Sequence, residues 1–424
     1  MRRVVETIVA LFLVGLWLLW LLPVLIPGFR PPLALPGLPA LHLPTVDLRR
    51  LMRFMLGFGA GVAAGTVLGW VWSYWTGKKR AGEMVYFQVY PNTDFVLSGE
   101  GAKTFLRSLA RALKTGPAGL WGQPYFRFLV VAEGQNRPAR LYFGVPKGLG
   151  KMFGDACRAS YRAAELVPAE GSPVAGLPLD GGEAVELGLL ERGGRWVLPL
   201  KSFEPADPDP LDGVILGLGA GNTYENEVSV LDVLFEPVPE RRRLYAPGVR
   251  YIKRLLRGEP EEVSLVEVKN TLLGVKKGRA GANLSGAEKQ EVLAVQKKCS
   301  PPEKAFRVAV RLFARADHPG AGWARVYSAL AGFERMTYLN ALRPRGSRGL
   351  PGMAKMIGQR IRSGVFLPGE GFVLSSSELA GLVHIPDGRS AAWEVLAKAV
   401  SRQKPPEIDL LVWGSEHAGT DRGG

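Results

Sequence analysis

The sequence predicts an α+β protein: a two-helix membrane hairpin followed by two ferredoxin-like α+β units, the second with an insertion. Residues 8–26 and 54–75 contain no charged side chain. At about 1.5 Å per residue, each run is long enough to cross a hydrocarbon layer of about 30 Å as a helix. After residue 80, short apolar runs typical of strands alternate with segments of helical periodicity. These observations predict an anchor followed by a folded body.

The second apolar run has a glycine at every fourth position, a spacing that places these residues on one helix face. They are Gly57, Gly61, Gly65 and Gly69. Another helix can approach such a face closely, although a glycine-rich composition alone also explains the ladder. Aromatic residues end the run at Trp75, and Lys78–Arg80 follow, as at a membrane–water interface.

Residues 1–80 are expected to form the whole anchor. Arg2 and Arg3 would also suit a secretory signal peptide. The long apolar core, the lack of a small-residue cleavage site and the nearby second span favour a hairpin instead. Five prolines in residues 29–45 indicate an extended connector. Basic residues lie both in the connector and outside the hairpin, so the positive-inside rule favours one orientation only by a small difference in charge. We expect a two-span protein of the cell membrane with its body in the cytoplasm.

The net charge of +15 comes from 54 basic and 39 acidic residues. Nucleic acid and lipid head groups are therefore reasonable partners, and a solvated arginine-rich surface is the alternative. The two cysteines and four histidines are scattered along the chain without ligand spacing. Their positions argue against a disulfide framework and a metal site.

Residues 81–170 are expected to form the first unit. Strands are predicted at 84–89, 125–131, 141–145 and 164–167, and helices at 99–114 and 148–165. The order β-α-β-β-α-β is that of a ferredoxin-like fold.

Residues 171–400 are expected to form the second unit, with a tail at 401–424. Strands are predicted at 184–190, 195–200, 227–235 (ended by Pro237 and Pro239) and 305–314. One helix begins after Asp209-Pro210, another carries Trp323 to Phe333, and a capping box at Ser375–Glu378 precedes a third helix over 379–384. A basic insertion at about 240–300 splits this unit, and the similar order of elements hints at internal duplication.

No motif predicts catalysis, a cofactor or a metal, and we expect a protein that is not an enzyme. Gly217–Gly221 and Gly148–Lys151 lack the features of a phosphate loop and are expected to be turns. Helix capping explains three clustered carboxylates, Asp207, Asp209 and Asp212. His384, near a helix end, is expected to be structural.

Basic residues in and around the insertion are candidate nucleic-acid contacts: Arg241, Arg242, Arg243, Lys276, Lys277, Lys297 and Lys298. Such residues can follow a phosphate backbone. No RNA- or DNA-binding motif accompanies them, so these residues are not by themselves a specific signal of nucleic-acid binding.

The segment Phe372–Pro386 resembles the sequence leucine-(Ser/Asn)-x-x-Glu-Leu-Ala-x-Leu-x-His-(Leu/Phe)-Pro. That sequence precedes the motor domain of membrane-associated ATPases of type IV secretion and conjugation, in the HerA–FtsK superfamily. Further segments resemble the same region in the same order: Val145–Tyr161, Val197–Phe203 with Asp209–Leu211, Phe235–Val238, Lys304–Phe313 and Lys404–Leu410. Asp232 stands where the resembling proteins have glutamine.

No Walker A, Walker B or arginine finger accompanies these segments. The resemblance therefore implies the non-motor part of a conjugative or type IV secretion-like DNA-transfer machinery. Its partners would be lipid, a separately encoded HerA/FtsK-like ATPase, further copies of the chain in a homo-oligomer, and DNA through backbone phosphates. The alternatives are a membrane scaffold or a membrane enzyme unrelated to DNA transfer.

Overall fold

The computed structural model describes most of the chain after residue 47. The described residues are 48–91, 99–113, 123–135, 137–161, 164–190, 197–204, 209–219, 224–256, 285–300, 302–318, 320–345, 352–367, 370–386 and 388–398. The chain divides into two units: residues 1–76 with 367–369, and residues 77–366 with 370–424. The first apolar run and the proline-rich connector lie outside the described residues, and so does the tail.

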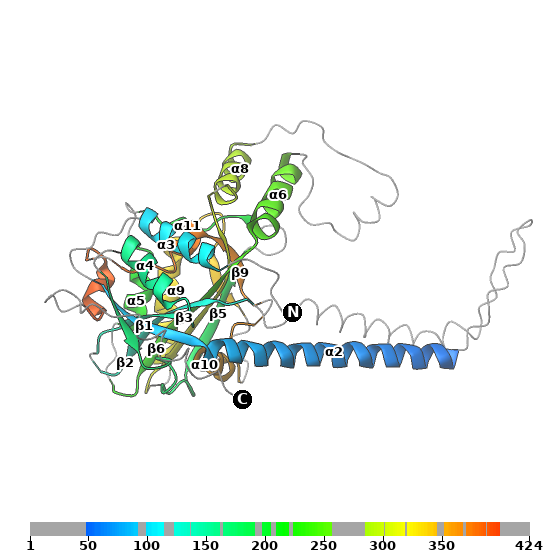
Figure 1. The fold of residues 1–424 in the computed structure, drawn as a ribbon, viewed down its shortest axis with the longest axis horizontal. Helices are drawn as coiled ribbons and strands as arrows, with labels where there is room; N and C mark the ends of the chain where they lie inside the picture. Colours follow the sequence, from blue (N-terminus) through cyan, green and yellow to red (C-terminus); the bar gives the residue numbers. More distant parts are fainter. Residues whose placement is uncertain are drawn as a thin grey trace, which may run out of the picture. The chain divides into compact units, whose positions relative to one another are not determined.

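The first unit is described mainly by the helix α2 (Leu48–Gly82), whose last turns belong to the second unit. The second predicted apolar run, residues 54–75, lies within this helix (Figure 1). Among the described residues, no helix combines the length and apolar character that a membrane crossing requires.

The second unit is built on one nine-stranded sheet in the order β4-β1-β3-β2-β6-β7-β5-β8, with β9 paired to β7. Figure 1 labels six of these strands, β1, β2, β3, β5, β6 and β9. All its strand pairs are antiparallel. The strands are β1 (Met84–Tyr90), β2 (Phe126–Glu133), β3 (Arg140–Pro146), β4 (Glu165–Ala169), β5 (Glu183–Leu189), β6 (Val228–Val238), β7 (Ala305–Arg315), β8 (Leu342–Arg345) and β9 (Phe372–Ser375). The predicted α+β class is confirmed.

Helices connect these strands. They are α3 (Gly99–Ala112), α4 (Gly150–Ser160), α5 (Asp212–Gly219), α6 (Ala246–Leu256), α8 (Gly286–Lys298), α9 (Ala321–Gly332), α10 (Met353–Ser363) and α11 (Ser376–Ala380). Short π and 3-10 turns add η2 (Arg241–Tyr245), η3 (Phe333–Met336) and η4 (Ala391–Val395).

The two halves of the sheet have mirrored strand orders. The first half reads β4-β1-β3-β2 from its outer edge, and the second reads β8-β5-β7-β6 from the opposite edge. In each half the chain passes through strand, helix, strand, strand, helix and strand. The halves join where β2 pairs with β6, so one continuous sheet runs through the residues predicted as two domains. The insertion with η2, α6 and α8 lies between β6 and β7.

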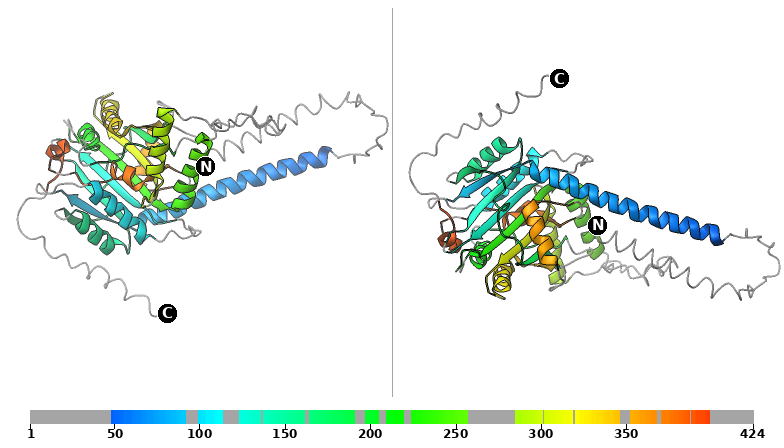
Figure 2. Two further views of the ribbon diagram at one scale, coloured as in Figure 1. Left: turned by 90° about the horizontal axis from the view of Figure 1, so that it is seen from above. Right: turned by 90° about the horizontal axis from the view of Figure 1, so that it is seen from below.

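Side chains alternate across this sheet, as the two-residue period of a strand requires. Phe128 and Val130 of β2 belong to the larger core, which α3, α4, α5, α9 and α11 cover. Leu129 and Val131 belong to the core on the other face, which α10 covers through Ile357 and Ile361 (Figure 2). Both faces are therefore buried at the centre of the sheet.

Close approach of α5 and α9 depends on glycine. A Cβ at Gly217 would lie 2.5 Å from the backbone nitrogen of Ala329, and one at Gly213 would lie 2.7 Å from the Cα of Gly332. The prediction of a turn beginning at Gly217 is wrong, because α5 continues to Gly219. These glycines bring two helices together, which explains a glycine-rich sequence without a phosphate loop.

Three element boundaries also differ from the predictions. Strand β6 continues through Pro237, which pairs with Phe306 of β7 but lies beyond the end of the β2 ladder, where a missing N–H is tolerated. Residues 197–200, predicted as part of a strand, form no strand. The capping box of Ser375 with Glu378 is confirmed, but the helix it begins ends at Ala380.

Candidate functional site

Several of the segments that carry the resemblance to the ATPases meet in one junction, whereas Lys404–Leu410 lies outside the described residues. Glu378 completes the capping box of α11, and its Oε1 accepts a hydrogen bond from the backbone nitrogen of Leu200 at 2.7 Å. The same oxygen forms an ion pair with Lys298 Nζ at 3.0 Å. Strand β9 pairs with Ala305–Val308 of β7, whose other neighbour there is the Phe235–Val238 stretch of β6. Segments far apart in the sequence thus form one packed structure.

His384 holds the other side of this junction. Its Nε2 lies 2.9 Å from Asp209 Oδ1, and its Nδ1 lies 2.8 Å from the carbonyl oxygen of Ala380. The imidazole stacks on Phe203 with 4.7 Å between ring centroids, and the residue is fully buried. The prediction of a structural histidine is confirmed.

Glu303 joins the junction to α3. Its carboxylate accepts hydrogen bonds from Ser376 Oγ at 2.7 Å, Ser377 N at 2.9 Å and Ser377 Oγ at 2.6 Å. Arg107 of α3 donates to it at 3.0 Å. Burial alone would raise the pKa of Glu303, but the hydrogen bonds from the serines and Arg107 hold that pKa below its usual value. The carboxylate is therefore a structural anion at neutral pH.

The predicted nucleic-acid contacts separate in the structure. Lys298 is buried, with 4 % of its surface exposed, and pairs with Glu378, so we remove it from the candidate contacts. Lys297 is exposed and pairs with Glu204 at 3.3 Å. Arg243 is exposed on η2. Arg241 and Arg242 lie on η2, and nothing is described of their side chains; Lys276 and Lys277 lie outside the described residues.

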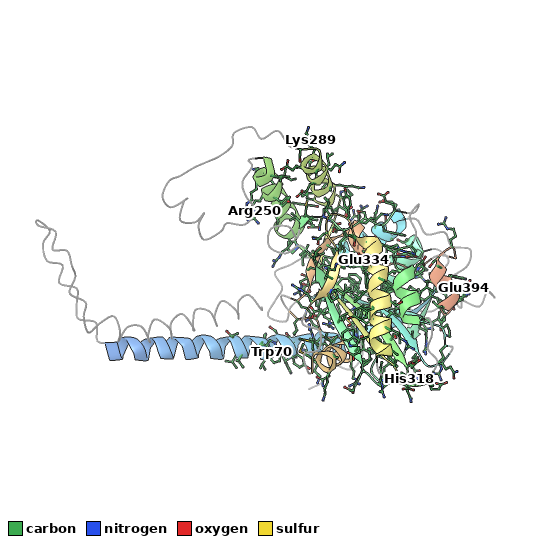
Figure 3. The ribbon with its side chains drawn as sticks, turned by 180° about the vertical axis from the view of Figure 1, so that it is seen from behind. Trp70, Arg250, Lys289, His318, Glu334 and Glu394 are labelled. Carbon is green, nitrogen blue, oxygen red and sulfur yellow. The ribbon has the colours of Figure 1, made fainter. Side chains whose placement is uncertain are left out.

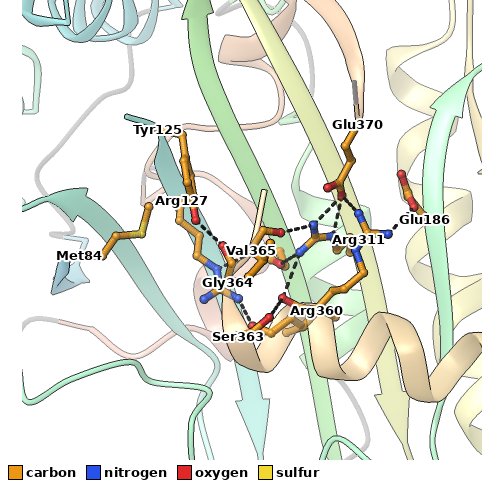
Figure 4. Close-up of polar contacts among 12 residues, drawn as sticks. Met84, Tyr125, Arg127, Glu186, Arg311, Arg360, Ser363, Gly364, Val365 and Glu370 are labelled. Carbon is orange, nitrogen blue, oxygen red and sulfur yellow. Dashed lines mark hydrogen bonds and ion pairs between the residues drawn. The ribbon is translucent and has the colours of Figure 1, made fainter. Parts of the chain in front are cut away.

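An ion-pair network joins three strands next to α10. Figure 4 shows the part of it around Arg311, Arg360 and Glu370. Asp232 of β6 accepts from Arg127 Nε of β2 at 2.7 Å and from Arg311 Nη1 of β7 at 3.2 Å. All three side chains are 0 % exposed. Glu370 pairs with Arg311 at 2.5 Å and also with Arg360 of α10.

The two buried arginines also hold the C-terminal end of α10. Arg127 Nη2 donates to the carbonyl oxygen of Ile361. Arg311 donates to the carbonyl oxygens of Arg360 at 3.2 Å and Val365 at 2.7 Å. The last carbonyls of a helix lack partners within the helix and carry its negative dipole end, which favours a nearby cation. The arginines therefore fix α10 to the sheet.

Burial and neighbouring acidic groups shift the pKa values of these arginines in opposite directions. Burial alone would lower the pKa of Arg127, but Asp232 and the hydroxyl of Tyr86 raise it above its usual value. Burial would likewise lower the pKa of Arg311, and Glu370 and Asp232 raise it. Both guanidinium groups stay charged, so their carboxylate partners are needed to offset the cost of burying them.

The last turn of α2 attaches to the same part of the sheet. Arg80 Nη1 donates to the carbonyl oxygen of Gln123 at 2.6 Å, and its guanidinium lies 5.5 Å from the ring centroid of Tyr125. A Cβ at Gly77 would lie 2.9 Å from Val365, so only a glycine fits there without movement. Tyr125 in turn donates to the carbonyl oxygen of Gly364 at 2.6 Å. The end of α2 is thus held by the segment that follows α10.

Farther toward its N-terminus, α2 exposes a large apolar surface. Its exposed apolar and aromatic residues are Val67, Leu68, Trp70, Val71, Trp72, Tyr74 and Trp75, each between 39 % and 68 % exposed. Within the described residues, nothing lies within 4 Å of a Cβ placed at Gly61, Gly65 or Gly69. Gly57 lies on the same helix, and its surroundings are not described. Trp70 is labelled on this helix in Figure 3.

The cysteines, the metal-ligating side chains and Asp212 were the remaining described groups with possible chemical roles. Burial raises the pKa of Cys157 to about 12 and that of Cys299 to about 11, so both thiols are protonated at neutral pH. No group of three metal-ligating side chains is found among the described residues. Asp212 accepts hydrogen bonds from Ser390 Oγ and from the backbone nitrogen of Ala392, so it acts within the fold.

Residues 146–395 match the family model described as "Domain of unknown function (DUF8128)". This match covers more than half of the chain. The chain belongs to this family. The DUF8128 segment includes α4, β4 and every element from β5 to η4, and therefore both the junction around Glu378 and most of the ion-pair network. No curated protein matches the chain.

Proposed function

We propose that this protein is a membrane-anchored, non-catalytic platform of a conjugative or type IV secretion-like DNA-transfer machinery, which docks a separately encoded HerA/FtsK-like ATPase. The observation that carries the proposal is the junction around Glu378 and His384. Each of these short motifs resembles a motif of the ATPases separately. In the folded chain they pack together through buried hydrogen bonds. A chance likeness of separate segments would not require them to meet.

We also propose that each half of the sheet is a ferredoxin-like unit. The order β4-β1-β3-β2 and its mirror β8-β5-β7-β6, with antiparallel pairs throughout, support this assignment. The second unit would then be a copy of the first whose central hairpin has received the insertion. An internal duplication accounts for both the mirrored order and the joining of β2 to β6.

The anchor is proposed to be a two-span hairpin of residues 8–26 and 54–75, with the body in the cytoplasm. Exposed Trp, Val and Leu side chains around α2 support contact of this helix with lipid. The open glycine positions at Gly61, Gly65 and Gly69 suit close packing against another apolar helix, in the same chain or in a further copy of a homo-oligomer.

The arrangement suggests how such a platform would hold its shape. Arg80 fixes the end of α2 to the start of β2, while Arg127 and Arg311 fix α10 to the centre of the sheet. A docking surface built on this sheet would keep a fixed geometry relative to the last turn of α2.

Co-purification tests the proposal. The full-length chain, tagged and extracted in mild detergent, should retain the HerA/FtsK-like ATPase encoded in its gene neighbourhood, and should not retain an unrelated hexameric ATPase added as a control. Loss of the neighbouring ATPase in mild detergent would favour a scaffold unrelated to DNA transfer. Stoichiometric ATP on the isolated chain would favour an enzyme and contradict the proposal.

A further inference from the structure

The helix α6 presents a basic face that its packing leaves exposed. Arg250, Lys253 and Arg254 are exposed and lie within about 100° of arc on a helix of about 100° per residue. Arg243 is exposed about two turns earlier, on η2. Figure 3 labels Arg250 on α6 and Lys289 on the neighbouring α8. Arg250, Lys253 and Arg254 form what we call the α6 basic face.

Described carboxylates do not neutralise this face. Glu288 of α8 is used in the capping box with Ser285, and Glu291 accepts a hydrogen bond from Tyr251 of α6. Among the described residues, no ion pair joins a carboxylate to Arg250, Lys253 or Arg254. Among the described residues, nothing offsets the repulsion between these basic side chains, and an anionic partner would relieve it.

The opposite face of α6 is already occupied. Tyr251 and Ile252 pack with Val295 of α8. Gly248 lies against Cys299, which leaves no room for a side chain there. A helix that inserts into a lipid surface needs a free apolar face to bury among the acyl chains. Of the described apolar side chains of α6, Val249 is 49 % exposed. A single exposed valine is much less than the apolar face that insertion requires, so the exposed charges are the main feature that α6 offers a partner, as in contacts with a nucleic-acid backbone.

We infer that the α6 basic face contacts the phosphate backbone of duplex DNA without reading its bases. The inference rests on the proposed function for the identity of the polyanion, and on exposure, charge and packing for the site. At about 1.5 Å rise per residue, the three side chains span about 6 Å of helix and more with their own length, enough for neighbouring phosphates. The described aromatic residue next to them, Tyr251, uses its hydroxyl on Glu291 and packs within the protein, so it is not placed to read a base edge.

Titration of DNA against the full-length protein tests this inference. The protein is placed in phosphatidylcholine nanodiscs, and binding of a short fluorescein-labelled duplex is followed by anisotropy across a series of salt concentrations, with two unrelated sequences. The test variant is R250Q/K253Q/R254Q. The matched control is R111Q/K147Q/K151Q, which removes three exposed charges from other surfaces. Circular dichroism checks that both variants fold.

The wild type should bind both sequences equally. The α6 variant should bind roughly tenfold more weakly or worse, with the slope of log affinity against log salt reduced by about 2.7, at about 0.9 per lost phosphate contact. The control should change affinity less than about twofold. Equal losses in the two variants would mean that net charge alone attracts DNA, and would overturn the site.

Unchanged DNA affinity in the α6 variant also overturns the inference. This includes the case in which the α6 variant keeps its DNA affinity but no longer binds added phosphatidylserine vesicles. The latter result would assign the face to lipid head groups. The assay contains no ATPase, so its failure is distinguishable from failure of the proposed function. Co-purification of the ATPase can succeed while DNA binding fails, and the reverse.

Discussion

Replacing Asp232 with asparagine tests the ion-pair network that fixes α10 to the sheet. The substitution keeps the size and shape of the side chain but removes its charge. It also places an amide N–H₂ group where one of the two oxygens now accepts from Arg127 at 2.7 Å or from Arg311 at 3.2 Å. Two fully buried guanidinium groups then share a neutral side chain that offers one acceptor oxygen, and its amide N–H₂ group faces one of the guanidinium donors.

Breaking a buried ion pair by removing one partner costs about 3–5 kcal/mol, because the remaining charge stays buried without compensation. Asp232 pairs with two buried arginines, Arg127 and Arg311. Of these two, only Arg311 has a second carboxylate partner, Glu370. At about 2 °C per kcal/mol, the low end for large domains, the midpoint of thermal unfolding should fall by about 6–10 °C. The loss should be visible by circular dichroism of the purified protein.

A surface ion pair supplies the matched control. Asp180 pairs with Arg362 of α10 at 3.0 Å, but Asp180 is 56 % exposed. Solvent screening limits such a pair to about 0–1 kcal/mol, so D180N should shift the midpoint by no more than about 2 °C. If D232N lowers the midpoint no more than D180N does, the buried network does not fix α10, and the reasoning about it is refuted.

Three further predictions concern other parts of the body. Hydrogen bonds hold the pKa of Glu303 in the folded protein below its value in the unfolded chain. The ionised carboxylate therefore stabilises the fold at pH values above the unfolded pKa, and this stabilisation is lost as the pH falls through the folded pKa. In urea unfolding, E303Q should therefore flatten the acid side of the curve of unfolding free energy against pH. G217A should destabilise by about 1–3 kcal/mol through overpacking, while G286A, where a Cβ meets open space, should not destabilise. Because burial raises the pKa of both thiols, iodoacetamide at neutral pH should label Cys157 and Cys299 only after denaturation, as mass spectrometry would show.

Periodicity carried most of the fold prediction. The alternation of Phe306, Val308 and Val310 with Arg307 and Arg311 in β7 is confirmed, because a strand with two different faces shows itself in a two-residue period. The capping box at Ser375 is confirmed for a similar reason: its hydrogen bonds join residues three apart in the sequence. Local interactions of this kind are readable from local sequence.

Long-range polar contacts were not readable in this way. Arg127 stands inside a run of apolar residues, and its partner Asp232 follows about a hundred residues later. A charge within an otherwise buried strand is a signal that a buried counter-charge exists, but the sequence does not say where. Lys298 was predicted as a nucleic-acid contact because it lies near other basic residues in the sequence. Its side chain instead points inward to the carboxylate of Glu378, which the local sequence does not reveal.

Extraction of cell membranes with alkaline carbonate tests the central claim most directly. This treatment releases proteins held at the surface by charge and leaves those anchored by apolar spans in the pellet. We predict that the full-length chain stays in the carbonate-washed pellet and that its neighbouring ATPase can be recovered with it after mild detergent treatment without carbonate. Recovery of the chain in the carbonate supernatant, or in the cytosol without lipid, would contradict a membrane-anchored platform.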